Sequence, residues 1–279
     1  MDKCTSTEIL RARQALAGAC AGYAAGATTD AVFYVVDAYK TQAQAGVSGA
    51  HSLRQLTRGL VPLSLAGSAP SMAVFFLAYQ PLKEVAGSNA VAVAVCSAAA
   101  TVPATLVYVP SDIIKKQVVT GVQPDVRTAV RSILASQGVR GLWVGTHANL
   151  MKDIPFATVK MSLYEGMLYV SRRIQGKTPS QLTASDSAVV GFASGAITAV
   201  ATNPIDVVNT RLKMGAAPSD WSVRTVMMDI MKREGVKTLF TGLPARLFTI
   251  GFGSSLFWSV YAEVHSYVSS SSESFNRAQ

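Results

Sequence analysis

The sequence contains few cysteines and few charged residues, and both shortages exclude classes of protein. Its three cysteines, Cys4, Cys20 and Cys96, have neither CxxC nor metal-ligand spacing. They therefore predict free or buried thiols, not a disulfide framework or a zinc site. The sequence also shows no nucleophile motif and no phosphate-binding loop. We therefore expect that the protein is not an enzyme and that it binds neither a metal ion nor a cofactor.

Charged residues make up only 15% of the chain, and most of them are positive. The 25 Lys and Arg residues outnumber the 16 Asp and Glu residues, which gives a formal net charge of +9. The basic residues form no dense run and are not interleaved with aromatic residues, so no nucleic-acid surface is predicted. Anionic phospholipid headgroups around the protein, or an electropositive aqueous cavity within it, would explain the excess.

Both ends of the chain are polar. Asp2 and Glu8 lie within residues 1–9, and acidic residues there argue against a cleavable transit peptide. Residues 269–279 are rich in serine and predict a disordered tail.

Hydrophobic residues make up 49% of the chain and gather in long apolar stretches. Each stretch is long enough to cross a bilayer, for which about 20 residues suffice. Isolated charges interrupt them, which suits helices with one face toward lipid and one toward water or protein. The six stretches are residues 12–39, 62–82, 89–116, 146–172, 187–210 and 243–267. We therefore predict an all-α membrane protein with six transmembrane helices.

The stretches form a threefold repeat. Asp37, Asp112 and Asp206 each lie near the end of an odd-numbered stretch, and the even-numbered stretches resemble one another. Polar segments typical of short amphipathic helices separate the two stretches of each pair, at residues 48–59, 124–138 and 219–235. We predict a single domain over residues 1–279, with pseudo-symmetric repeats at about 12–84, 88–175 and 184–268.

One motif occurs once in each repeat, as 35-VVDAYK-40, 110-PSDIIK-115 and 204-PIDVVN-209. A proline, an acidic residue and a cation at this spacing resemble the signature of the mitochondrial carrier family. The glycine-bearing segments 137-QGVRGLWVG-145 and 234-EGVKTLFTG-242 also resemble the family. The resemblance extends from about Ala15 to about Val268. It implies a monomeric multi-pass transporter of the mitochondrial inner membrane, with each short helix on the matrix side.

The motif predicts a gate. Pro110 and Pro204 each remove a helical hydrogen bond and so kink their helices. The resemblance implies a ring of ion pairs that closes the matrix side, with Gln44 as a brace beneath it. The ring residues are Asp37, Lys40, Asp112, Lys115 and Asp206. Asn209 stands where the family has a cation, so we expect a weaker matrix gate unless Arg211 or Lys213 compensates.

A second motif of the family occurs at the other ends of the even helices, as 79-YQPLK-83, 164-YEGML-168 and 261-YAEVH-265. Of its charged residues, Lys83 and Glu165 remain, so one ion pair is expected in the cytoplasmic gate. The state closed to the cytosol should then be the less strongly held one. His265 is either a titratable element or a solvated helix-end residue, and the second is more common.

The resemblance places substrate contacts in the middle of the membrane. Lys152 and Asp153 together suit a zwitterion, because one side chain can bind an α-carboxylate and the other an α-ammonium. Asp30 lies seven residues before Asp37 and therefore on the same helix face, where it calls for a further positive charge on the ligand. The complete set of predicted contacts is Asp30, Gly67, Ser68, Ser71, Lys152, Asp153, Phe156, Ile250 and Gly251.

Three local segments, 67-GSAPSMAVFF-76, 110-PSDIIKKQ-117 and 152-KDIPF-156, resemble the S-adenosylmethionine carriers of this family. This implies alternating-access exchange of S-adenosylmethionine for S-adenosylhomocysteine, with Phe156 or Phe75 either stacked on the adenine or used in packing. A carrier of basic amino acids or of another cofactor has the same features. A degenerate, non-transporting membrane adaptor and a soluble helical protein are the further alternatives.

Overall fold

The computed structural model describes residues 2–44, 57, 60–87, 89–119, 121–143, 146–176, 183–213 and 223–277. Within these ranges the side chains of residues 2–11, 39–44, 60–61, 147–148, 152, 206, 209–213, 223, 245 and 270–277 are not described. The described residues form helices joined by turns and contain no strand. The part of the chain that the structure describes is therefore all-α, as the sequence predicts.

The described chain contains six long helical segments, and two of them change helix type along their length. The continuous ones are α1 (Asp2–Gln44), α5 (Ala90–Val119), α7 (Thr146–Gln175) and α8 (Ala184–Lys213). The second segment comprises α3 (Leu60–Leu63), the π-helix η1 (Ser64–Ser68) and α4 (Ala69–Ala86). The sixth comprises α10 (Leu243–Leu247), the π-helix η5 (Phe248–Phe252) and α11 (Gly253–Arg277).

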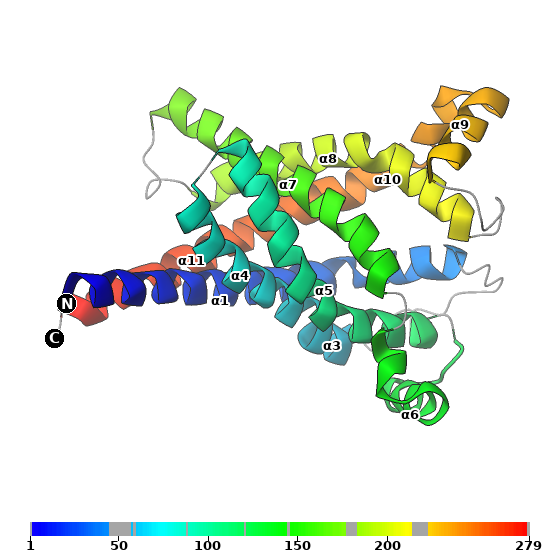
Figure 1. The fold of residues 1–279 in the computed structure, drawn as a ribbon, viewed down its shortest axis with the longest axis horizontal. Coiled ribbons are helices and arrows are strands. Elements are labelled where there is room, and N and C mark those ends of the chain that lie inside the picture. The colour runs from blue at the N-terminus through cyan, green and yellow to red at the C-terminus, as the bar shows by residue number, and fades with distance from the viewer. Residues whose placement is uncertain are drawn as a thin grey trace.

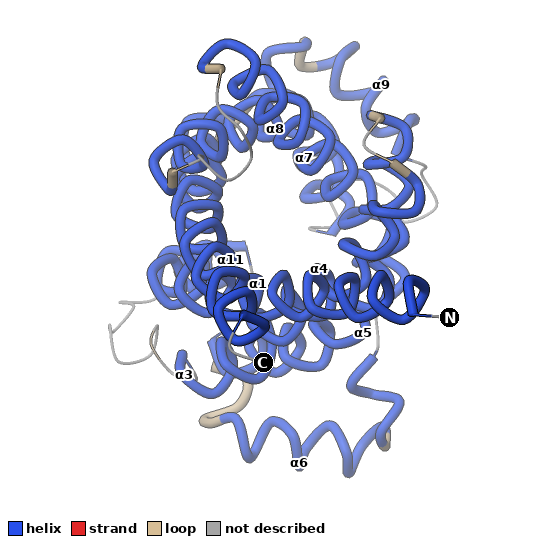
Figure 2. The backbone as a smooth tube through the Cα atoms, turned by 90° about the vertical axis from the view of Figure 1, so that its left-hand side faces the viewer, coloured by secondary structure: helices blue, strands red, loops and turns tan. Residues whose placement is uncertain are grey.

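The long segments form a closed ring. Around it the order is α1, α4, α5, α7, α8 and α11, and α11 packs back against α1 (Figure 2). Both chain termini lie at one end of the molecule, and α6 and α9 lie at the opposite end (Figure 1). We call these the termini end and the short-helix end.

Two of the predicted short helices are present, α6 (Val126–Gln137) and α9 (Val223–Arg233). The 3₁₀ segments η2 (Val139–Trp143) and η4 (Val236–Phe240) follow them. In α6, Ala129 and Ile133 are buried against the end of α5, and in α9, Val226 and Ile230 are buried against the end of α8. The predicted segment 48–59 lies outside the described residues, apart from position 57.

Glycines allow the closest contacts between helices. A Cβ on Gly22 of α1 would lie 2.8 Å from the carbonyl oxygen of Met72 in α4. A Cβ on Gly195 of α8 would lie 2.8 Å from the carbonyl oxygen of Ile250 in η5. These neighbours are backbone atoms, which cannot move aside easily, so a side chain at either glycine would force the helices apart.

Two of the described helices are long and apolar enough to cross a bilayer on length and composition alone: α5, and residues Ala184–Ile205 of α8. The helix boundaries follow the apolar stretches, with differences at the two ends of the chain. At the N-terminus, α1 begins at Asp2, ten residues before its apolar stretch. The serine-rich sequence predicts a disordered tail from Ser269, whereas α11 continues as a helix to Arg277. Neither a proline nor a glycine occurs between these positions to end the helix.

Candidate functional site

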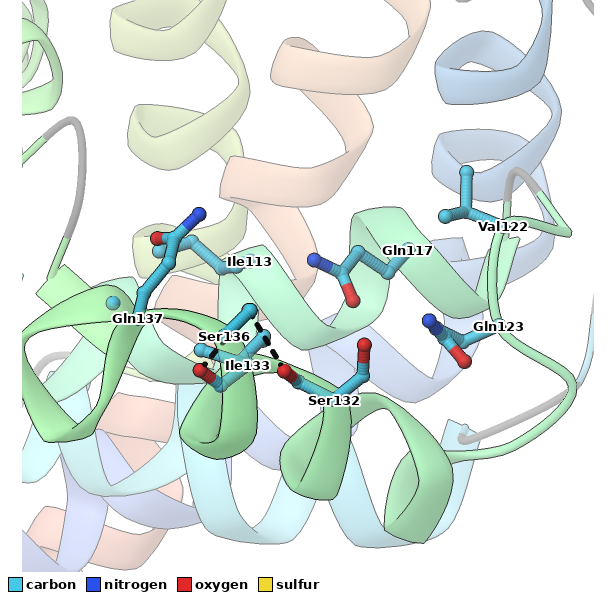
Figure 3. A pocket seen from close by; sticks show the side chains of 9 residues that line it. Ile113, Gln117, Val122, Gln123, Ser132, Ile133, Ser136 and Gln137 are labelled. Carbon is cyan, nitrogen blue, oxygen red and sulfur yellow. Dashed lines mark hydrogen bonds between the residues drawn. The ribbon is translucent and has the colours of Figure 1, made fainter.

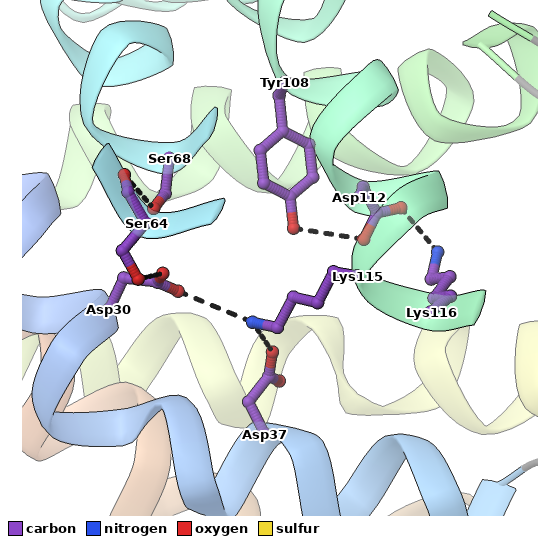
Figure 4. A network of polar contacts seen from close by, with 8 residues as sticks. All are labelled: Asp30, Asp37, Ser64, Ser68, Tyr108, Asp112, Lys115 and Lys116. Carbon is purple, nitrogen blue, oxygen red and sulfur yellow. Dashed lines mark hydrogen bonds and ion pairs between the residues drawn. The ribbon is translucent and has the colours of Figure 1, made fainter. Parts of the chain in front are cut away.

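Lys115 of α5 joins two carboxylates of α1 inside the ring. Its Nζ atom lies 2.9 Å from Oδ2 of Asp37 and 3.5 Å from Oδ1 of Asp30, and its side chain is only 10% exposed. The same ammonium lies 4.4 Å from the ring centre of Tyr34, between the two aspartates in sequence. This contact links α5 to α1, the first long helices of two repeats (Figure 4).

Asp30 is held from a second direction by η1. The Ser64 hydroxyl donates a hydrogen bond to Oδ2 of Asp30, and the Ser68 hydroxyl donates to the Ser64 carbonyl at 3.3 Å. The π-helix η1 packs against both α1 and α5. Asp30 therefore lies where three helical segments meet, and its charge is satisfied by a hydroxyl and an ammonium.

Asp112 is buried and has partners on its own helix. It forms an ion pair with Lys116, one turn further along α5, and accepts a hydrogen bond from the Tyr108 hydroxyl at 3.3 Å (Figure 4). The sequence predicts Asp112 as a member of the matrix ring, and the structure adds Lys116 as its ion-pair partner. A cation at i+4 was nevertheless visible in the sequence, because such pairs share a helix face.

Tyr108 lies within electrostatic range of four carboxylates, of which Asp112 is its hydrogen-bond partner. Asp30, Asp37, Asp112 and Asp153 are all close enough to act electrostatically on its hydroxyl. We call these four residues the acidic cluster. They come from α1, α5 and α7, and the described cations paired with them are Lys115 and Lys116.

The termini end is closed by contacts between the even-numbered helices. Lys83 of α4 forms an ion pair with Glu165 of α7, which also accepts a hydrogen bond from the Tyr79 hydroxyl at 3.4 Å. The Gln80 amide of α4 donates to the Tyr261 hydroxyl of α11 at 2.9 Å.

Aromatic side chains complete this closure. Tyr164 of α7 stacks on Trp258 of α11 with ring centres 3.4 Å apart. We call Tyr79, Tyr164, Trp258 and Tyr261, all buried, the aromatic plug. The sequence predicts the ion pair at this end but not the neutral contacts beside it, although the tyrosines belong to the same motif.

The small residues predicted to contact substrate on the second helix lie against α5. The Ser71 hydroxyl donates to the Ala104 carbonyl at 3.0 Å and is buried. Gly67 is so close to the Ser111 side chain that no Cβ would fit. These two positions therefore serve packing between helices in this conformation.

The residues predicted to contact substrate on the sixth helix also pack against a neighbouring helix. A Cβ on Gly251 would lie 3.0 Å from the ring of Phe192 in α8, and the Ile250 carbonyl faces Gly195. On α7, by contrast, Asp153 and Phe156 are half-buried side chains. The side chains of five other predicted residues lie outside the described part of the chain: Lys40, Gln44, Lys152, Asp206 and Asn209.

The proline kink of α5 has a partner that sequence reasoning missed. Pro110 lacks an N–H group, so the Leu106 carbonyl loses its helical donor. The indole Nε1–H of Trp143 in η2 donates to that carbonyl at 3.0 Å. In the third repeat the residue before Pro204 also bonds the following 3₁₀ segment, since the Asn203 amide donates to the Leu239 carbonyl of η4 at 2.7 Å.

A cavity of about 300 Å³ lies between α5 and α6 (Figure 3). Among the described residues, its lining side chains are uncharged, and they include Gln117, Gln123, Ser132 and Gln137. It therefore provides no charged partner for a zwitterionic or cationic ligand, unlike the acidic cluster.

Comparison with known proteins agrees with this architecture. The family model described as "Mitochondrial carrier protein" matches residues 86–173 and 180–272. The chain is 31% identical to S-adenosylmethionine carrier 1, chloroplastic/mitochondrial, of Arabidopsis thaliana, over 87% of this chain and 76% of the relative. It is 30% identical to the mitochondrial S-adenosylmethionine carrier protein of Xenopus laevis, over 91% of this chain and 98% of the relative. It is 32% identical to the putative mitochondrial carrier protein PET8 of Eremothecium gossypii, over 90% of this chain and 97% of the relative. The chain therefore belongs to the mitochondrial carrier family.

Proposed function

We propose that this chain transports S-adenosylmethionine across the mitochondrial inner membrane, in exchange for S-adenosylhomocysteine, by alternating access. As a member of a carrier family it moves a solute and is not an enzyme. In this proposal all six long segments cross the bilayer. The short-helix end faces the matrix, and the termini end faces the cytosolic side.

The observation that carries the proposal is the placement of Asp30 within the acidic cluster. Four carboxylates inside a membrane bundle are costly unless cations accompany them. The described cations beside them are Lys115 and Lys116, and Lys116 is half-exposed. A ligand with its own positive charges can share Asp30 with Lys115, and S-adenosylmethionine brings a sulfonium and an ammonium. Relatives that bear its name support the same substrate.

We assign the chemical groups of the substrate as follows. Asp30 faces the sulfonium, Asp153 the ammonium, and Phe156 the adenine. Phe75 is less suited to the adenine, because it is buried and already stacked on Tyr79 at 5.6 Å. The family resemblance implies a carboxylate contact for Lys152, whose side chain lies outside the described part of the chain.

Sharing of Lys115 couples substrate binding to the gate. In the absence of substrate, Lys115 is attracted to α1 by both Asp30 and Asp37. A sulfonium beside Asp30 neutralises one of these carboxylates and places a like charge near the ammonium. A hydrogen bond to a charged group contributes about 1.5–3 kcal/mol, so weakening this link favours separation of α1 from α5.

The termini end supplies the opposite gate. In this conformation Lys83, Glu165 and the aromatic plug close that end. Opening it breaks one ion pair together with several neutral contacts. These neutral contacts add to the single ion pair that the sequence predicts for this gate.

Transport in reconstituted liposomes tests the proposal. Labelled S-adenosylmethionine is supplied outside, and S-adenosylmethionine, S-adenosylhomocysteine or lysine inside. We expect uptake with the first two internal solutes and little with lysine. Uptake driven by lysine would indicate a basic amino acid carrier, and no uptake by folded protein would refute transport of S-adenosylmethionine.

Two variants, one within the site and one outside it as a control, test the role of Asp30 in transport. Asp30→Asn should reduce uptake at least 10-fold, because it removes the carboxylate that faces the sulfonium. Asp229→Asn is the control, since Asp229 pairs with Arg233 on α9, away from the acidic cluster. A membrane adaptor would keep its cellular phenotype in both variants, whereas a carrier would lose it only in the first.

A further inference from the structure

Lys160 of α7 points into the interior of the ring. Its Nζ atom lies 5.8 Å from the ring centre of Phe257 in α11. In the ring α8 lies between α7 and α11, so a contact between them passes through the interior. Tyr164, one turn further along α7, makes the same crossing when it stacks on Trp258.

Lys160 differs from the other interior lysines in its partners. Lys115 is paired with Asp30 and Asp37, and Lys83 is paired with Glu165. Within the described part of the chain Lys160 has an aromatic neighbour, but no carboxylate lies within ion-pair distance. An ammonium at membrane depth requires an anion or water, and in transporters such a residue marks the substrate pathway.

The position of Lys160 on α7 places it opposite the acidic cluster. Asp153 and Phe156 precede it by seven and four residues, so all three share one face of the helix. Lys160 is about 10 Å from Asp153 along the helix axis. It lies next to the aromatic plug, which begins with Tyr164 one turn further along.

We propose that Lys160 binds the carboxylate of the transported substrate. This inference rests on the proposed function and adds an anchor that the family resemblance did not assign. The interior then has a dipolar character, with carboxylates toward the short-helix end and one ammonium beside the aromatic plug. A zwitterion with additional positive charge fits this arrangement in one orientation, with its carboxylate toward the termini end.

Comparison of a substrate with its decarboxylated analogue tests the assignment. In liposomes, the wild-type protein should take up S-adenosylmethionine in preference to decarboxylated S-adenosylmethionine. Lys160→Gln should raise the KM for S-adenosylmethionine about 10- to 100-fold and leave uptake of the analogue unchanged. Lys160→Arg, which keeps the charge, should retain most of the preference. Lys232→Gln, on α9, is the matched control and should behave as the wild type.

Two results would overturn the inference. One is a Lys160→Gln variant that keeps the wild-type preference for the carboxylated substrate. The other is loss of this preference in Lys152→Gln alone, which would assign the carboxylate to Lys152. Thermal unfolding without ligand shows whether each variant is folded, and Lys160→Arg provides a test if the glutamine variant is not.

Failure of the proposed function gives a different result. If folded wild-type protein takes up neither adenosyl compound, the substrate assignment is wrong. The test of Lys160 then uses the ligand-induced rise in Tm with lysine and with cadaverine, which lacks the carboxylate. A larger rise with lysine that disappears in Lys160→Gln supports the anchor under another substrate. No difference between these two ligands in the wild type would overturn the anchor as well.

Discussion

The indole of Trp143 compensates for a proline, and this role can be measured. Pro110 leaves the Leu106 carbonyl without its helical donor, and the Trp143 Nε1–H group occupies that place at 3.0 Å. Trp143→Phe keeps an aromatic ring and removes the donor. The equivalent segment of the third repeat has Phe240 at this position, so a phenylalanine fits the segment.

The expected cost follows from the exposure of the site. A hydrogen bond contributes about 0.5–1.5 kcal/mol net, and a buried carbonyl left without a donor costs about 1–3 kcal/mol. Trp143 is 40% exposed, so water can partly replace the indole. We therefore expect a loss of about 1 kcal/mol. For a chain of this size that corresponds to a decrease in Tm of about 2–4 °C.

A double-mutant cycle isolates the interaction. Pro110→Ala restores a backbone N–H that can bond Leu106, so Trp143→Phe should cost almost nothing in that background. The assay is thermal unfolding of the purified protein in detergent, with all four combinations under the same conditions. An equal decrease in Tm in both backgrounds would refute the role of the indole, because the effect would then come from packing.

Three further predictions concern the gate, the packing and the short helices. Asn209→Lys should raise Tm and slow exchange, because it supplies the missing cation of the matrix gate; unchanged transport and stability would count against a ring. Gly195→Ala should destabilise the protein by about 1–3 kcal/mol, since its Cβ would meet the Ile250 carbonyl; a Tm equal to that of wild type would contradict this contact. Asp125 is the N-cap of α6, and hydrogen bonds from Thr128 lower the pKa of its carboxyl. The stabilisation of the fold by this carboxylate is therefore present above the pKa that Asp125 has in the unfolded chain. It is lost as pH falls through the pKa of the folded protein. The Tm difference between wild type and Asp125→Ala should therefore shrink in acid, and a difference independent of pH would argue against the cap.

The parts of the fold that sequence could predict depend on local patterns. The stretch 89–116 became α5 (Ala90–Val119) because a largely apolar run of this length favours a helix in a packed or lipid surrounding. The motif that contains Asp112 and Lys115 could also be identified from the sequence, because its residues are only a few positions apart in one helix. Neither inference required knowledge of how helices are placed relative to one another.

The side-chain partners could not be predicted in the same way. Ser64 reaches Asp30, and Trp143 reaches Leu106, only because the helices carrying them adopt particular rotations and separations. A pair of residues distant in sequence acquires its geometry from the packing of all the helices between them. Lys116 is the exception, since its bond to a residue one turn earlier was local and could have been weighed.

Helix type explains why the even helices differ in their predicted contacts. The prediction treats the second, fourth and sixth helices as equivalent, whereas η1 and η5 are π-helical and the matching part of α7 is α-helical. A π-turn holds an extra residue, which changes the faces that the flanking turns present. Gly67 and Gly251 lie within these turns and pack against neighbouring helices. The charged and aromatic groups proposed to recognise substrate therefore lie mainly on α1 and α7, and the site is asymmetric although the fold repeats three times. Such asymmetry suits a ligand whose carboxylate, sulfonium and adenine are all different.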